Sequence, residues 1–180
     1  IIQISILALS IILLARPQFG TKISNEKRQG IEMVIAIDIS NSMLAQDVNP
    51  SRLEKSKLLV ENLINKFEND KIGIVVFAGD AFIQMPITSD YISAKMFLNS
   101  LTPSYIEAQG TDISKAIDQS LQCFSQKEGI GRAIVLITDG EDNEGGAIEK
   151  AQEAYKKGVN IFILRVGEKE GAVIPLPNGE

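Results

Sequence analysis

The sequence predicts an α/β protein with a doubly wound, mostly parallel central sheet, helices on both faces and one antiparallel edge strand. From residue 31 onward, short β-branched and aliphatic runs alternate with amphipathic segments. This alternation is typical of strands and helices wound into one parallel sheet. The chain has 180 residues, 44% of them hydrophobic, which suits a single folded domain with appendages.

Strands covered on both faces are expected where aliphatic residues run almost without interruption. These runs occupy residues 31–37, 72–77, 133–138 and 159–166, and a near-continuous apolar run is typical of strands in a parallel sheet. Gly79 and Asp80 form a turn pair, so residues 81–85 are expected to fold back as an antiparallel edge strand. Pro86 suits an edge because proline cannot donate a ladder hydrogen bond.

Helices are predicted where apolar residues recur three and four positions apart. Two such patterns run over residues 53–67 and 113–124, and shorter ones run over residues 91–101 and 147–156. Gly158 follows the last of these in a C-terminal capping position. The single cysteine, Cys123, cannot form an internal disulfide and is interpreted as a small core residue of its helix.

The two ends of the chain are expected to lie outside the complete domain. Residues 1–16 are almost entirely apolar up to Arg16, and we interpret them as the truncated end of a transmembrane helix, because a full span needs about 20 apolar residues. A buried or signal-type segment is the alternative. Residues 17–30 form a polar connector, and residues 31–180 form the domain, which we expect to lack its last strand and helix.

Composition excludes several classes of function. The chain contains no histidine, which removes histidine-dependent triads, histidine metal ligands and histidine acid–base catalysis. Its formal net charge of -5 provides no excess of basic residues, so we expect no nucleic-acid partner. The chain also has no G-x-x-x-x-G-K-S/T loop, which excludes a P-loop nucleotide site.

Side chains with oxygen atoms gather at predicted strand ends. Asp38, Ser40 and Ser42 alternate after the first strand, Asp139 follows the strand at 133–138, and Thr111 precedes the helix at 113. Each piece alone commonly caps a turn or helix. In an open parallel sheet, however, ligands bind outside the carboxyl ends of the strands, so the set is expected to converge there.

This donor set predicts a metal site for a hard divalent cation. Hydroxyl and carboxylate oxygens without thiolate or imidazole favour Mg²⁺, with Mn²⁺ and Ca²⁺ as alternatives. Because Mg²⁺ gives up its waters reluctantly, Asp38 and Asp139 are expected to hold waters while the hydroxyls ligate directly. The remaining position could be filled by an acidic group from a partner.

The residues above resemble those of a known family. From residue 31 to about residue 166, the chain resembles von Willebrand factor A domains with a metal-ion-dependent adhesion site, whose fold is Rossmann-like. The motif positions correspond to Asp38, Ser40, Ser42, Thr111 and Asp139. Residues 42–53, together with residues 15–18, further resemble the aerotolerance-type (BatA/BatB-like) membrane proteins of bacteria.

The resemblance implies a non-enzymatic protein anchored in the bacterial inner (cytoplasmic) membrane by one or more passes. It also implies a soluble domain on the periplasmic side and association with MoxR-type AAA+ ATPases and other Bat proteins. The basic residues Arg16, Lys22, Lys27 and Arg28 favour the cytoplasmic side instead, because cytoplasmic loops carry an excess of Lys and Arg. The side of the membrane therefore stays open at the level of sequence.

The leading functional hypothesis is a metal-ion-dependent, adhesion-type protein-binding module that presents a divalent cation to an acidic residue of a partner. The alternative is a metal-dependent phosphohydrolase that uses Asp38 as its nucleophile. Against it, Ser40 stands where the haloacid-dehalogenase pattern requires an acid. A scaffold with a vestigial site is a third possibility, which the five intact positions weigh against.

Other charged residues have ordinary interpretations. Glu141, Asp142 and Glu144 are interpreted as a solvated loop face that tunes the charge around the site. Asp47 and Arg52 are explained equally well by the family stretch or as a helix-start acid and a surface base.

Overall fold

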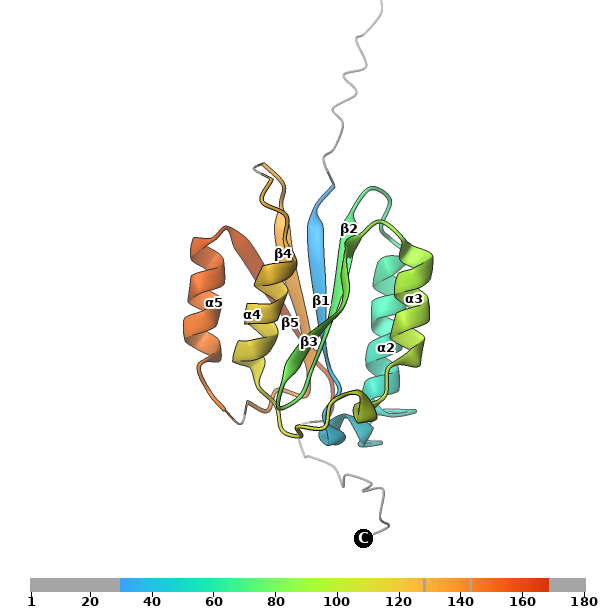
Figure 1. Cartoon of the computed structure of the whole chain (residues 1–180). Helices are drawn as coiled ribbons and strands as arrows, with labels where there is room; N and C mark the ends of the chain where they lie inside the picture. The colour runs from blue at the N-terminus through green and yellow to red at the C-terminus, as the bar shows by residue number, and fades with distance from the viewer. Residues whose placement is uncertain (1–29, 128, 143, 169–180) are drawn as a thin grey trace, which may run out of the picture.

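The sheet of the computed structural model, which describes residues 30–127, 129–142 and 144–168, has five strands in the order β3-β2-β1-β4-β5 (Figure 1). The strands are β1 (Glu32–Asp38), β2 (Lys71–Phe77), β3 (Ala81–Thr88), β4 (Arg132–Thr138) and β5 (Val159–Arg165). β3 pairs antiparallel with β2, and every other pairing is parallel. The predicted fold class is confirmed.

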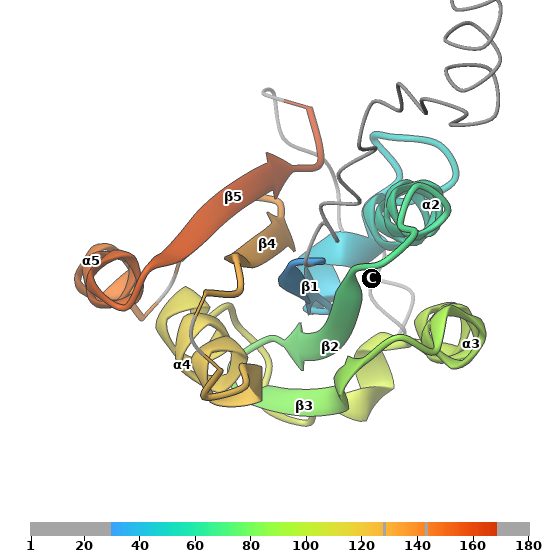
Figure 2. The same ribbon diagram turned by 90° about the horizontal axis from the view of Figure 1, so that it is seen from above.

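Two layers of helices enclose the sheet (Figure 2). The helices are α2 (Arg52–Ile64), α3 (Tyr91–Ser100), α4 (Ile113–Cys123) and α5 (Ala147–Lys156), with short 3-10 helices η1 (Asn41–Leu44) and η2 (Pro103–Tyr105). α2 and α3 cover one face, and α4 and α5 cover the other. All four α-helices were predicted, and Gly158 adopts the positive φ of 74° that its capping position requires.

The core consists of two clusters, one on each face of the sheet. Successive side chains of a strand point to opposite faces, so β1 contributes Ile35 and Ile37 to the cluster under α2 and α3. It contributes Val34 and Ala36 to the cluster under α4 and α5. All four are fully buried, as the aliphatic run predicted, and this central strand fixes the position of the loop that follows it.

β5 differs from the prediction of a strand covered on both faces. Phe162, Ile163 and Leu164 are 56%, 63% and 42% exposed. Consecutive side chains point to opposite faces of the sheet, and among the described helices β5 packs mainly against α5, at the edge of the sheet. A continuous apolar run predicts a strand, but it does not determine how many neighbours cover that strand.

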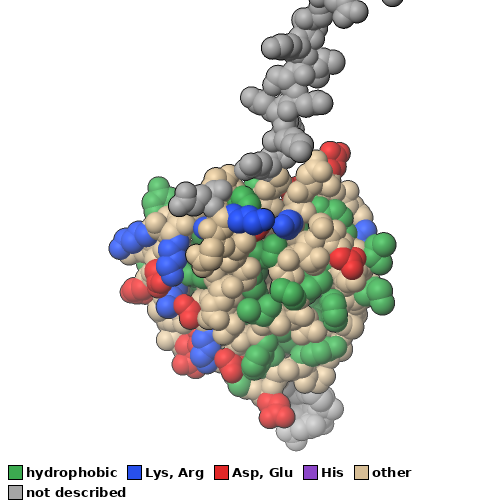
Figure 3. All heavy atoms as spheres, turned by 45° about the horizontal axis from the view of Figure 1, so that its top comes forward, with side chains coloured by type: hydrophobic (Ala, Val, Ile, Leu, Met, Phe, Trp, Pro, Cys, Tyr) green, Lys and Arg blue, Asp and Glu red, His purple; other side chains and the backbone are tan. Residues whose placement is uncertain are grey.

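β3 is longer than predicted and continues past Pro86 to Thr88. Proline is tolerated because β3 lies at the edge of the sheet, and the β2–β3 register shifts between Ile72 and Val75. Apolar side chains gather over β3 and the neighbouring helix α3, whereas charged side chains of both signs mix on the side of α4 and α5 (Figure 3). The apolar residues exposed there include Phe82, Ile83, Ile92, Met96 and Phe97.

The interpretations of residues 1–16 and of 17–29 lie outside the described residues, as does everything after residue 168. Within the described ranges, no helix combines the length and the apolar character that crossing a membrane requires.

Candidate metal centre

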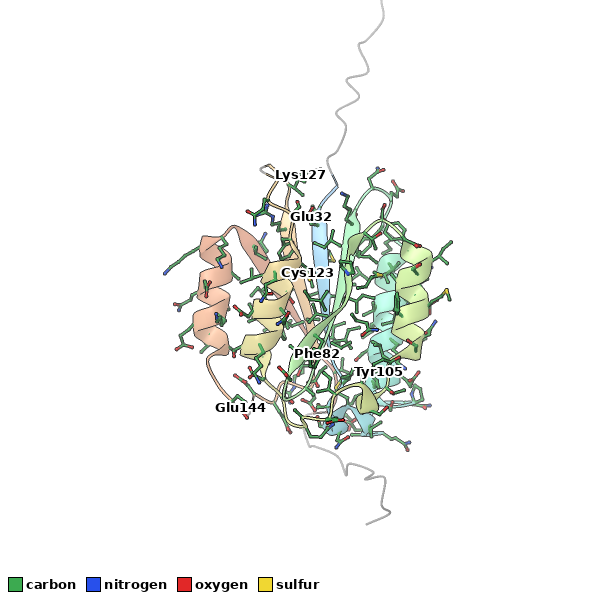
Figure 4. The ribbon with its side chains drawn as sticks, in the orientation of Figure 1. Glu32, Phe82, Tyr105, Cys123, Lys127 and Glu144 are labelled. Atoms are coloured by element: carbon green, nitrogen blue, oxygen red, sulfur yellow. The ribbon has the colours of Figure 1, made fainter. Side chains whose placement is uncertain are left out.

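The candidate site lies at the carboxyl ends of two adjacent parallel strands. β1 and β4 pair in register up to Ile37 and Ile137, so Asp38 and Asp139 emerge at the same end of the sheet. The 3-10 helix η1 lies at this end (Figure 1). Tyr105 and Glu144 lie toward it as well, whereas Glu32 lies near the opposite end (Figure 4).

Asp38 is a fully buried carboxylate held by neutral donors. Its Oδ1 accepts a 2.9 Å hydrogen bond from the Ser40 amide, and its Oδ2 accepts a 2.7 Å bond from the Thr138 hydroxyl. Burial raises the pKa of Asp38 to about 6, with a further rise from the charge of Asp139, although the hydrogen bonds from Ser40 and Thr138 oppose it. A nearby cation would therefore stabilise the charged form of Asp38.

Ser40 and Ser42 place two buried hydroxyl groups beside each other. Their Oγ atoms are 2.9 Å apart, and the residues are 3% and 9% exposed. Ser40 occupies the N-cap position of η1, but its side chain makes no capping hydrogen bond. The capping role that Ser40 could have had is therefore absent, and its hydroxyl lies between the Ser42 hydroxyl and the Asp38 carboxylate.

Thr111 belongs to a third loop, which is held against the loop of Ser40 and Ser42. The residue is 1% exposed and precedes Asp112, whose carboxylate caps the start of α4 by accepting from the Lys115 amide at 2.9 Å. The Gln109 side chain of this loop accepts a 3.2 Å hydrogen bond from the Asn41 amide at the start of η1. The loop of Thr111 thus borders the loop of Ser40 and Ser42.

Asp139 is buried and shared between two donors. Its Oδ2 accepts a 2.9 Å bond from Nη1 of Arg52, and its Oδ1 accepts a longer bond of 3.3 Å from the Glu141 amide. Arg52 also pairs with Asp47, through bonds of 2.9 Å and 3.0 Å to the two carboxylate oxygens. The Arg52 hydrogen bond is the main cause that lowers the pKa of Asp47 to about 2.

The interpretation of Arg52 as a surface base is wrong, because Arg52 is only 6% exposed. The contact between Arg52 and Asp139 joins residues 87 positions apart, so local patterns could not predict it. One signal was present in the sequence: an arginine in the first turn of a helix faces the unfavourable end of the helix dipole, which calls for a compensating carboxylate.

The donor set fits a hard divalent cation. Three loops together supply two buried carboxylates and three hydroxyls, which are the oxygen ligands that Mg²⁺ and similar ions prefer. Among the residues that the structure describes, no cluster of three or more His, Cys, Asp or Glu side chains offers another metal site. Glu141, Asp142 and Glu144 are exposed, in agreement with a solvated loop face.

The sequence around this site matches a known protein family. The family model described as von Willebrand factor type A domain matches residues 33–141. The chain belongs to this family. The matched span contains all five candidate residues of this von Willebrand factor A domain, together with Asp47 and Arg52.

Two solved structures share most of this domain. BatB from Bacteroides thetaiotaomicron is 58% identical, with a TM-score of 0.81 over 84% of this chain and 74% of that chain. An aerotolerance-related membrane protein from Bacteroides fragilis is also 58% identical, with a TM-score of 0.80 over 82% and 73% of the two chains. The resemblance to aerotolerance-type proteins is confirmed.

The chain is also similar to more distant proteins. An uncharacterised protein of Borreliella burgdorferi is 34% identical over 157 residues, and the chain spans about half the length of this relative, 45%. Two proteins below 25% identity share only the fold: a mussel byssus thread matrix protein with a zinc-occupied MIDAS motif, TM-score 0.65, and manganese-loaded TRAP of Plasmodium vivax, TM-score 0.64.

The raised pKa of Asp38 predicts an unusual pH dependence of stability without metal. The pKa is about 6 in the folded protein and near the ordinary 3.8 in the unfolded chain, so between these values only the folded state binds the proton. The free energy of unfolding should therefore rise by about 2–3 kcal/mol as pH falls from 7 to about 4. Below pH 4 the stability gained from Asp38 no longer increases. The stability contributed by Asp47 is then lost, because its pKa is lower in the folded protein than in the unfolded chain.

Urea unfolding in EDTA at pH 7, 5 and 4 measures this dependence. Asp38→Asn provides the control, since it removes the titrating group and should abolish the rise. A native protein that is less stable at pH 5 than at pH 7 would contradict the prediction.

Proposed function

We propose that this domain is a metal-ion-dependent protein-binding module that holds one divalent cation and presents it to an acidic residue of a partner protein. The observation that carries the proposal is the buried carboxylate of Asp38. Among the described residues, no lysine or arginine pairs with it, and two hydroxyl groups and Asp139 lie beside it. A charge buried without a cationic partner is costly, and a bound cation would offset that cost.

The carboxylates and the hydroxyls of the site are expected to bind the cation differently. Asp38 and Asp139 already accept hydrogen bonds at their carboxylate oxygens, so we expect them to hold waters of the cation. The hydroxyls of Ser40, Ser42 and Thr111 are the expected direct ligands. When bound, the cation supplies an electrophilic position that a carboxylate of the partner can complete.

Mg²⁺ is the proposed ion, with Mn²⁺ and Ca²⁺ as alternatives. The compact, all-oxygen donor set supports a hard cation over a soft one. One distant relative with a zinc-occupied MIDAS motif and another that is manganese-loaded support a divalent ion as the ligand.

We also propose that the domain acts at the bacterial inner membrane, on the periplasmic side, and without enzymatic activity. Two observations support the proposed membrane location: the similarity to a protein named as an aerotolerance-related membrane protein and the apolar residues 1–15. Within this setting, MoxR-type AAA+ ATPases and other Bat proteins are the proposed partners, as the family resemblance implies.

Calorimetric titration of the full chain with MnCl₂ and MgCl₂ tests the metal proposal. The double variant Ser40→Ala/Ser42→Ala should bind Mn²⁺ at least 100-fold more weakly than the native protein, because two direct ligands are lost. Ser120→Ala removes an equally buried hydroxyl that donates to the Ala116 carbonyl of α4, and it should leave the affinity unchanged. A native protein that is folded but binds neither ion would overturn the proposal.

A further inference from the structure

Arg52 is a buried cation beside the candidate metal site that the proposed function does not by itself explain. It lies in the first turn of α2 and is 6% exposed. The dipole of a helix disfavours positive charge at this end, and burial of a guanidinium is costly unless it is paired. Its position is therefore explained by the carboxylates that it contacts.

The guanidinium of Arg52 joins two of the loops that form the site. Nε and Nη2 form a two-pronged contact with the carboxylate of Asp47, while Nη1 donates to Oδ2 of Asp139 at 2.9 Å. Nη1 also lies 3.5 Å from the carbonyl oxygen of Ser42. Only the planar fork of arginine can make these contacts together, because a lysine ammonium acts as a single point charge.

Asp47 neutralises the positive charge of Arg52. Arg52 can therefore contact Asp139 without taking the place of a metal ion as the counter-charge of the site. The Asp47 side chain is 5% exposed and contacts Arg52 through both oxygens. Asp47 is itself fixed by the Glu168 amide, which donates to its Oδ2 at 2.6 Å. With Arg52 and Asp47 offsetting each other, the negative charge of Asp38 and Asp139 remains available to a cation.

We propose that Arg52 is a positioning residue of the metal site: it fixes Oδ2 of Asp139 and so holds Oδ1 of Asp139 toward the cation or its waters. Oδ1 accepts only the 3.3 Å hydrogen bond from Glu141 among the described contacts, which leaves it with acceptor capacity. The inference rests on the proposed function, because it assigns Arg52 a role toward the same cation.

The sign of the effect of Arg52→Gln on Mn²⁺ affinity separates positioning from simple repulsion. If Arg52 only repelled a cation, its removal would strengthen binding. If Arg52 positions Asp139, Arg52→Gln should weaken Mn²⁺ binding at least tenfold although a positive charge has been removed, and Arg52→Lys should weaken it as well. Lys57→Gln is the matched control, since Lys57 is equally buried on the same helix but pairs with Glu54, and its affinity should stay native.

Titration calorimetry of the full chain, with thermal unfolding as a check of folding, measures these affinities. Arg52→Gln that binds as tightly as the native protein, or more tightly, would overturn the proposal. If Arg52→Gln does not fold, Arg52→Lys tests the proposal in its place. Native Mn²⁺ affinity in Arg52→Lys would equally overturn the proposal.

The exchange rate of the Glu141 amide, measured without metal, reports whether Asp139 keeps its position, because this amide donates to Oδ1 of Asp139. This measurement does not depend on metal binding. Arg52→Gln should raise the exchange rate of this amide at least threefold, because its acceptor Oδ1 is released, whereas Lys57→Gln should not. If the native protein bound no Mn²⁺ but the Glu141 amide still responded, the metal function would fail while the positioning of Asp139 stood. An unchanged Glu141 amide in a folded Arg52→Gln variant would overturn the positioning itself.

Discussion

Replacement of Asp38 by asparagine should abolish metal binding and at the same time stabilise the metal-free protein. Asp38 is fully buried, and burial raises its pKa to about 6, so its ionisation costs about 2–3 kcal/mol at pH 7. Asparagine keeps the size and one oxygen, and the Thr138 hydroxyl can turn to accept from the new amide group. We expect the metal-free variant to gain about 1–3 kcal/mol in free energy of unfolding.

The same variant should bind Mn²⁺ at least 100-fold more weakly, because it lacks one of the two carboxylate charges. Urea unfolding with EDTA and with saturating MnCl₂ measures both effects, since a ligand at 100 times its Kd stabilises a folded protein by about 2.7 kcal/mol. The native protein should gain stability from Mn²⁺, and Asp38→Asn should not. A metal-free variant less stable than the native protein would show that Asp38 is a structural group.

Replacement of Gly79 by alanine should displace the loop that carries Thr111. A Cβ atom at Gly79 would lie 2.4 Å from the carbonyl oxygen of Gln109 and 2.9 Å from that of Ala108, and both are backbone atoms that cannot turn aside. The Gly79 amide also donates to the Ala108 carbonyl at 2.9 Å. Overpacking of this kind costs about 1–3 kcal/mol of stability.

Because Thr111 is a proposed direct ligand, Gly79→Ala should also weaken Mn²⁺ binding at least tenfold. Urea unfolding and calorimetric titration measure the two effects. Asp80→Asn changes the adjacent residue of the same turn without adding an atom against the loop, so it should keep native affinity. Gly79→Ala with native stability and native affinity would mean that the turn and the loop move independently.

Local patterns predicted most of the fold because its strands and helices follow the period of their apolar residues. The run at 31–37 became β1 with a shift of one residue, and the positions of Asp38 and Asp139 followed from the parallel order of the strands. Exposure of Phe162 in β5 could not be predicted, since it depends on what lies beside the strand. The buried state of Arg52 depends on Asp139, a residue brought near only by the completed sheet.

Because β1 runs parallel to β2 and β4, the chain enters the sheet at one end and the candidate site lies at the other. Gly30 stands just before β1 and the site stands at the end of β1, so the 7 residues of the strand separate the two by about 20 Å. The site therefore lies at the end of the domain opposite to the point where the chain enters at Gly30. A partner of the proposed cation would approach this end of the domain, and the entry of the chain at Gly30 would leave that approach unobstructed.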